Sequence, residues 1–240
     1  MSIRGILFDK DGTLLDLNRT WVPVYRTAAL AVSGGDQGLA AQLLDAGGLD
    51  DNAGYIAPDS LLASGTTDEI AARWGAMAPT HGYGNLATVL DNIFLEQGAK
   101  STMPVAGLFS VIRSLKDSGL TLGIATSDSA SGARATLCPI DVLDQFDFIA
   151  GYDSGFGIKP EPGMVFAFCR ATSLPASAVM VVGESRHNLE MGRWAGAGLG
   201  IGVLTGSSRR TDLADHVVDS IADISGLLGL ETDGGVDGLT

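Results

Sequence analysis

The sequence predicts an α/β fold in which a doubly wound parallel sheet carries a separate helical domain inserted after its first strand. Two observations predict this fold. Short runs that are apolar throughout alternate with amphipathic helical patterns over most of the chain, as in sheets covered by helices on both faces. Residues 16–100 break the alternation, because they contain helical patterns and no convincing strand. We therefore predict a core domain, residues 1–15 and 101–240, and an inserted domain, residues 16–100.

Six short apolar segments are the expected strands of the core. They lie at residues 3–8, 120–126, 146–152, 179–183 and 199–204, with a weaker sixth at 216–220. Segments this short and this apolar fit strands that are covered on both faces. We therefore expect the sheet to be parallel, with helices between successive strands.

The helical pattern is clearest in residues 105–118. Leu108, Ile112 and Leu115 recur there at the spacing of one helix face, and Gly119 supplies a stop. Other expected helices lie at 161–172 and 187–196 in the core and at 21–33, 36–46, 67–76 and 85–97 in the inserted domain. The first strand is thus followed by a long helical segment before the α/β alternation resumes.

Composition excludes two classes of partner. With 15 Lys and Arg against 28 Asp and Glu, the chain of 240 residues carries a formal charge of −13. A general nucleic-acid binder needs many cationic contacts to phosphate, so we expect no nucleic-acid partner. No apolar run reaches the roughly 18 residues that a membrane span needs, and the N-terminal residues do not resemble a signal peptide. We expect a cytoplasmic protein with no membrane partner.

Cysteine and tryptophan usage predicts ordinary core residues. Cys138 and Cys169 lie in mostly apolar surroundings and form no CxxC pattern, so we expect two buried free thiols in a reducing compartment. Trp21, Trp74 and Trp194 fall at helical positions and are expected in the core.

Polar residues follow four of the expected strands at the point where each strand ends. They are Asp9 and Asp11 after the first, Thr126 after the second, Lys159 after the third and Glu184 after the fourth. The carboxyl ends of parallel strands share one edge of a sheet, so these residues should meet there. Paired carboxylates need a cation, and Mg²⁺ takes oxygen ligands together with substrate phosphate. The set indicates phosphoryl transfer to an aspartate.

The same residues carry a resemblance to a known family. DKDGTL at 9–14, Thr126, GIKPEPGM around Lys159 and GESRHNLEMGRWAGAG at 183–198 resemble, in order and spacing, the four signatures of the haloacid dehalogenase superfamily. The resemblance covers nearly the whole chain and is strongest to phosphoglycolate-phosphatase-type members. It implies a Rossmann-like core, and it identifies the inserted helical domain as a C1-type cap.

The resemblance implies a role for each of these residues. Asp9 would be the nucleophile that forms an aspartyl-phosphate, and Asp11 would protonate the leaving alkoxide and then activate water. Thr126 and Lys159 would hold the phosphoryl oxygens. The side chains of Asp9 and Glu184 and the backbone carbonyl of Asp11 would bind Mg²⁺.

Further residues complete the expected substrate contacts. Gly12 and Ser127 are expected at the phosphate, while Thr126 has an alternative role as the N-cap of the helix that follows it. In the cap, the expected contacts are Asn18, Arg19, Thr20 and residues 64–69. Arg19 can grip a substrate carboxylate, which would suit 2-phosphoglycolate, or it can form a salt bridge at the hinge.

The fourth signature departs from the family pattern. Glu184 and Asn188 stand where the superfamily usually has two aspartates. Glutamate is one methylene longer, and Mg²⁺ tolerates poor octahedral geometry badly. We therefore expect weaker binding of Mg²⁺ or a preference for Mn²⁺.

The function that we expect is Mg²⁺-dependent hydrolysis of a small phosphate ester, with 2-phosphoglycolate as the favoured substrate. Two alternatives remain open. One is a sugar phosphomutase or another sugar-phosphate phosphatase of the same superfamily. The other is a catalytically degenerate member that binds a ligand or a partner. The chain is expected to be a monomer or a homodimer.

Overall fold

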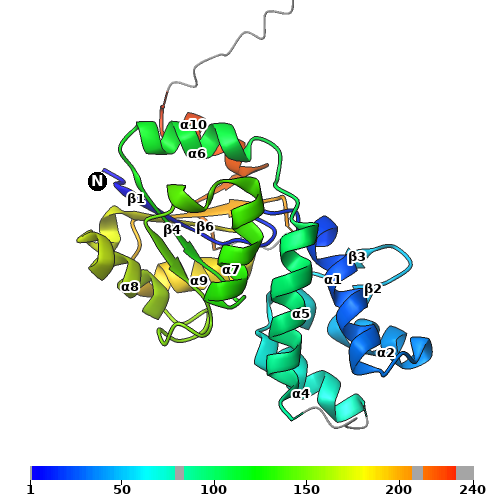
Figure 1. Ribbon diagram of the computed structural model, residues 1–240. Helices are drawn as coiled ribbons and strands as arrows, with labels where there is room; N and C mark the ends of the chain where they lie inside the picture. Colours follow the sequence, from blue (N-terminus) through cyan, green and yellow to red (C-terminus); the bar gives the residue numbers. More distant parts are fainter. Residues whose placement is uncertain (1, 79–83, 207–212, 231–240) are drawn as a thin grey trace, which may run out of the picture.

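The computed structural model describes residues 2–78, 84–206 and 213–230 and confirms the predicted fold class (Figure 1). The main sheet has six strands: β1 (Gly5–Phe8), β4 (Thr121–Ala125), β5 (Phe148–Ala150), β6 (Val179–Gly183), β7 (Leu199–Val203) and β8 (His216–Val218). Their order is β5-β4-β1-β6-β7-β8, and all neighbouring strands are parallel. The order reverses between β1 and β6, the place where open α/β sheets bind ligands.

The central strand β1 sends apolar side chains to both faces of the sheet. Within β1, Ile6 and Phe8 join one apolar cluster, and Leu7 joins another on the opposite face. This follows from the alternation of side chains along a strand. Both β1 and β6 are buried over their full length. Apolar composition alone therefore identified these strands correctly.

Helices form the outer layers of the core. In Figure 1, α6 (Leu108–Asp117) and α10 (Ile224–Leu227) lie on one side of the sheet, and α8 (Gly163–Thr172) and α9 (Arg186–Ala195) lie on the other. Helix α7 (Ala130–Leu137) lies toward the inserted domain. The core thus has three layers, with the sheet in the middle.

The inserted domain, which we call the cap, consists mainly of helices. They are α1 (Leu17–Val32), α2 (Gln37–Gly47), α3 (Leu61–Ser64), α4 (Thr67–Met77) and α5 (Leu86–Ser101). Helix α1 begins earlier than predicted, because Asp16 caps it by accepting a hydrogen bond from the Arg19 amide at 2.9 Å. The cap has its own apolar cluster, separate from the two in the core.

Two features of the cap were not predicted, the short helix α3 and a hairpin. Two short strands, β2 (Leu49–Asp50) and β3 (Tyr55–Ile56), form an antiparallel hairpin. Its turn is closed by the Asp50 carboxylate, which accepts hydrogen bonds from the amides of Asn52 and Ala53 at 3.1 and 3.0 Å. Strands of two residues are too short to show a period of two in the sequence.

Two predictions about buried side chains were wrong. Cys138 is exposed and Cys169 is only half-buried. Trp194 is 56% exposed, because it lies on the outer side of α9, whereas Trp21 and Trp74 are buried as predicted. Over the described parts of the chain, we find no helix with the length and apolar character that crossing a membrane requires.

Candidate active site

A cavity lies at the carboxyl edge of the sheet, where the sequence predicts the functional residues to meet. We call it the edge cavity. The core residues that line it are Asp9, Asp11, Thr126, Ser127, Lys159, Glu184, Ser185, His187 and Asn188, and the cap contributes Ala63 and Ser64. The strand ends therefore bring Asp9, Asp11, Thr126, Lys159 and Glu184 together.

Three of these side chains form a closed hydrogen-bonded triangle. Lys159 Nζ lies 2.7 Å from Asp9 Oδ1 and also donates to Asn188 Oδ1 at 2.7 Å. The Asn188 amide donates to Asp9 Oδ2 at 3.0 Å. Both carboxylate oxygens of Asp9 are thus held, and the Asp9 amide is fixed by the Val182 carbonyl at 2.8 Å. The carboxylate of Asp9 is therefore oriented from both the sheet and the side chains around it.

The triangle explains why asparagine can stand at position 188. An amide donates and accepts at the same time, so Asn188 joins the lysine and the carboxylate. An ionised aspartate could accept from Lys159 but could not donate to Asp9. This contact was not predicted, because it joins residues that lie far apart in the chain.

The longer side chain of Glu184 fits because two glycines leave room for it. Glu184 is 2% exposed. A Cβ atom at Gly12 would lie 2.8 Å from Glu184 Cγ, and a Cβ at Gly206 would collide with the Glu184 carboxylate. Gly12 also has a φ of +78°, which disfavours any other residue there. The substitution of glutamate for the usual aspartate is thus accommodated by the absence of side chains next to it.

Thr126 and Ser127 bring two hydroxyl groups to the edge cavity. Thr126 is buried, its amide donates to the Ala150 carbonyl at 3.0 Å, and its hydroxyl accepts from the Asp128 amide at 3.1 Å. The N-cap of α7 is Ser129, which accepts from the Gly132 amide at 3.0 Å. The alternative role of Thr126 as N-cap is therefore wrong. Its hydroxyl hydrogen remains available to a ligand in the edge cavity.

Asp11 is surrounded by groups that the sequence analysis did not assign to the site. Its carboxylate lies 2.8 Å from Lys10 Nζ and accepts a hydrogen bond of 2.6 Å from Trp21 Nε1. Lys10 is fully buried, and its ammonium group also lies 3.1 Å from Asp128. It lies 5.0 Å from the centre of the Trp21 ring, close enough for a cation–π contact. A fully buried lysine is almost always paired, but the sequence does not show that Lys10, two residues after β1, is buried.

Burial and nearby opposite charge shift the pKa of Asp11, and likewise that of Lys10, in opposite directions. Burial raises the pKa of the Asp11 carboxyl above its usual value, although the nearby Lys10 lowers it in part. Burial alone would lower the pKa of Lys10, but Asp11 and Asp128 raise it, so the lysine stays protonated. A carboxyl with a raised pKa is suited to donate and accept protons.

Two predicted contacts are not supported by the structure. The Gly12 amide donates to the Leu15 carbonyl at 2.7 Å, so it supports the loop and is not directed at a phosphate. Arg19 is exposed and lines neither of the cavities described here. It follows Leu17 by two residues, or about 200° around α1, and therefore faces away from the site. Among the described residues, Arg19 forms no ion pair, so its hinge role is unsupported as well.

The other predicted cap residues divide into structural and lining groups. Asn18 accepts from the Ile56 amide at 2.8 Å, and Thr20 accepts from the Met103 amide at 3.1 Å, so both connect segments of the chain. Within residues 64–69, by contrast, Ser64 lines the edge cavity, and Gly65 and Thr67 line its neighbour. The second group is therefore placed to contact a substrate.

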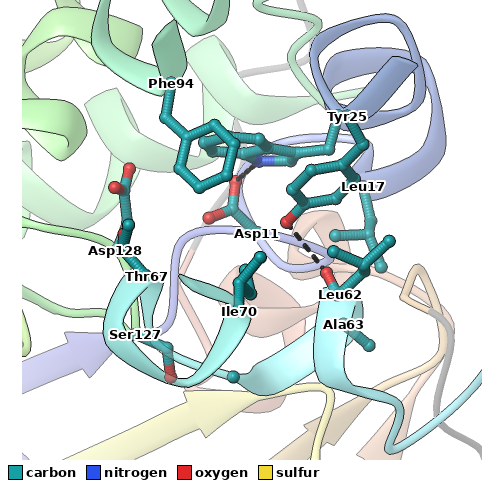
Figure 2. Close-up of a pocket in the computed structure, with 12 residues that line it drawn as sticks. Asp11, Leu17, Tyr25, Leu62, Ala63, Thr67, Ile70, Phe94, Ser127 and Asp128 are labelled. Atoms are coloured by element: carbon teal, nitrogen blue, oxygen red, sulfur yellow. Dashed lines mark hydrogen bonds between the residues drawn. The ribbon is translucent and has the colours of Figure 1, made fainter. Parts of the chain in front are cut away.

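The neighbouring cavity lies between cap and core, and we call it the aromatic cavity. It shares Asp11, Ala63 and Ser127 with the edge cavity. Figure 2 shows the Phe94 and Tyr25 side chains on the side of Asp11 that faces the cap. A group that extends from the edge cavity past Asp11 would enter this space.

The oxygen ligands of the edge cavity fit Mg²⁺. In the described parts of the chain, no group of three or more His, Cys, Asp or Glu side chains is arranged to hold a metal. Asp9 and Glu184 nevertheless line one cavity, and the side chain of Asp11 is engaged by Lys10, which leaves its backbone carbonyl as the third oxygen. One or two carboxylates, completed by waters and substrate phosphate, are what Mg²⁺ commonly takes.

The fold and the site together define a class, a doubly wound α/β protein with a helical cap over a carboxylate and lysine site. The family follows from the sequence: residues 3–196 match the haloacid dehalogenase-like hydrolases, and the chain belongs to that family.

Individual relatives are distant but similar over their full length. A phosphoglycolate phosphatase of Pectobacterium atrosepticum is 26% identical, covering 95% of this chain and 93% of its own. A phosphoglycolate phosphatase of Yersinia pseudotuberculosis is 27% identical, covering 95% and 94%. The crystal structure of CbbY from Rhodobacter sphaeroides in complex with phosphate has a TM-score of 0.69 at 21% identity, covering 95% and 99%.

Proposed function

We propose that this hydrolase is a Mg²⁺-dependent phosphatase that cleaves small phosphate monoesters through an aspartyl-phosphate. The triangle of Asp9, Lys159 and Asn188 carries this proposal. It fixes a carboxylate nucleophile beside a buried cation, and phosphoryl transfer to a carboxylate needs both orientation and charge neutralisation.

The first half of the reaction follows from the positions of these groups. A carboxylate oxygen of Asp9 attacks phosphorus, and the bond from phosphorus to the ester oxygen breaks. Asp11, in its protonated form, gives its proton to the departing alkoxide. Lys159 and the hydroxyl of Thr126 bind the phosphoryl oxygens during this step.

The second half restores the enzyme. Water attacks the phosphorus of the aspartyl-phosphate, and Asp11, now ionised, takes one proton from that water. The bond between phosphorus and Asp9 breaks, which releases inorganic phosphate and the free carboxylate. Asp9, Glu184 and the Asp11 carbonyl would hold Mg²⁺, which would supply positive charge to the phosphoryl oxygens.

The names of the relatives make 2-phosphoglycolate the first ester to test. Identity of 26–27% supports a shared reaction class more strongly than a shared substrate. A phosphomutase would use the same residues, but it would return the phosphoryl group to a sugar and would depend on a bisphosphate.

The test is release of inorganic phosphate from a panel of small esters with Mg²⁺, with Mn²⁺ and with EDTA. We expect release by the wild type with a metal, and none by Asp9→Asn or in EDTA. Release that requires added sugar bisphosphate would assign the phosphomutase. A folded protein that releases no phosphate from any ester with either metal would overturn the proposal in favour of a binding protein.

A further inference from the structure

The walls of the aromatic cavity are hydrocarbon and aromatic. Trp21 and Tyr25 stack with ring centres 5.5 Å apart, and Phe94 meets both edge-on at 5.7 and 5.6 Å. Leu62 and Ile70 add aliphatic side chains to the lining, and Figure 2 shows Leu62 next to the Tyr25 hydroxyl. The group that lies beyond the phosphate in a bound ester would therefore be surrounded mainly by carbon.

The polar atoms of the rings are already engaged within the protein. The Tyr25 hydroxyl donates to the Leu62 carbonyl at 2.9 Å, and Trp21 Nε1 donates to Asp11 at 2.6 Å. A ligand in the cavity would thus contact the faces of the rings and not their hydrogen-bond donors. The remaining polar lining consists of the hydroxyls of Thr67 and Ser127 and the two carboxylates.

The acidic side chains of this cavity are not matched by a cationic side chain on its described walls. Asp11 and Asp128 line it, and no Lys, Arg or His is among its described lining residues. The nearest cation, Lys10, is fully buried behind them and paired with both carboxylates. Burial raises the pKa of the Tyr25 hydroxyl well above its usual value, and the negative charges of Asp11 and Asp128 raise it further. An anionic group placed here would be repelled and would find no cation.

We infer that the alcohol released by this enzyme is small, uncharged and apolar, so that the substrate is not the ester of a hydroxy acid. The inference rests on the proposed phosphatase activity and specifies the substrate class of the same site. The cavity volume of about 40 Å³ has room for about three water molecules, which limits the alcohol to a few carbon atoms. The names of the relatives favour 2-phosphoglycolate, whereas the lining of this chain disfavours its carboxylate.

A matched pair of esters isolates the effect of the carboxylate charge of the substrate. Isobutyl phosphate and 2-phosphoglycolate have the same phosphate, the same linking carbon and the same branched shape, but only the second carries a carboxylate. We expect kcat/KM for isobutyl phosphate to be at least about tenfold higher, a preference of about 1.4 kcal/mol. A kcat/KM for 2-phosphoglycolate equal to or above that for isobutyl phosphate would overturn the inference.

A pair of variants at the boundary of the two cavities sharpens the test. Ala63 lines both cavities and is only half-buried, so it can carry a longer side chain. Ala63→Lys supplies the missing cation and should reduce the preference for isobutyl phosphate at least about tenfold, whereas Ala63→Met, of similar length, should not. An equal change in both variants would contradict the role of charge.

Measuring the binding of each ester tests this inference independently of the proposed function. Isothermal titration of Asp9→Asn with each ester measures the same preference without turnover, and we expect isobutyl phosphate to bind more tightly. If wild type hydrolyses no ester, the phosphatase proposal fails, and the order of binding still decides the substrate class. Tighter binding of 2-phosphoglycolate would overturn the inference on its own.

Discussion

The polar side-chain atoms of the core and of the cap are arranged differently around the two cavities. At the edge of the sheet, Asp9, Lys159 and Asn188 form hydrogen bonds with one another from three separate segments of the core. On the cap side, the polar atoms of Trp21 and Tyr25 are used internally, and the rings face the cavity. Under the proposed function, this difference assigns the chemistry to the core and the selection of the ester to the cap.

Asp11 is the one site residue that depends on both regions. Lys10 holds its carboxylate from the core, and Trp21 holds it from α1 of the cap. A change in the core should therefore affect all esters alike, a change in the cap should alter the ratio between esters, and a change near Asp11 should do both.

The largest effect is expected from Asp9→Asn, which removes the proposed nucleophile in the core. Turnover should fall by about 10⁴-fold or more for every ester, because no other group can take the phosphoryl. Phosphate release measures this loss, and thermal unfolding checks that the protein still folds. Asp147→Asn is the matched control, since Asp147 is paired with Lys116 and lines neither cavity. Unequal losses between esters would contradict the division between core and cap.

The next effect is on stability. Lys10→Met leaves Asp11 and Asp128 buried without their cation, so the free energy of unfolding should fall by about 3–5 kcal/mol. Lys116→Met removes a lysine from a more exposed pair with Asp147 and should cost about 1 kcal/mol or less. Urea unfolding measures both. Similar losses in the two variants would show that the buried pair is no more important than the surface one.

Trp21→Phe tests the contribution of the cap to the acid. The variant keeps an aromatic ring but loses the hydrogen bond to Asp11, so kcat for an alkyl phosphate should fall about tenfold. The loss should be smaller for p-nitrophenyl phosphate, whose leaving group needs no proton.

The control for this variant is Trp74→Phe. Trp74 is fully buried in the cap, and its Nε1 has no hydrogen-bond partner in the described part of the protein. Its substitution should lower stability but leave the ratio between the two esters unchanged. The same loss on both esters in Trp21→Phe would indicate a structural role for Trp21 and not a role in placing the acid.

The smallest effect is expected within the core, at Gly206. A Cβ at this position would press on the Glu184 carboxylate, so Gly206→Ala should raise the Mg²⁺ concentration for half-maximal activity about fivefold. Gly226→Ala is the control, because no atom lies within 4 Å of its added Cβ. An unchanged Mg²⁺ requirement would count against Glu184 as a ligand.

The sequence by itself determined the fold class and most of the edge cavity. Buried parallel strands are apolar throughout, and the ends of such strands share one edge, so the positions of Asp9, Thr126, Lys159 and Glu184 followed from local patterns. Helix boundaries were also set locally, as in the capping box of Thr66 and Glu69 at the start of α4.

Only the tertiary structure decided how these residues are held and what surrounds them. Trp21 and Asp128 come to the neighbouring residues Lys10 and Asp11 from two other segments, and Gly206 makes room for Glu184 from the loop after β7. The packing of the cap on the core brought the Trp21 ring into the aromatic cavity and its Nε1 to Asp11. Such environments depend on contacts between residues far apart in the chain, and local periodicity does not encode them.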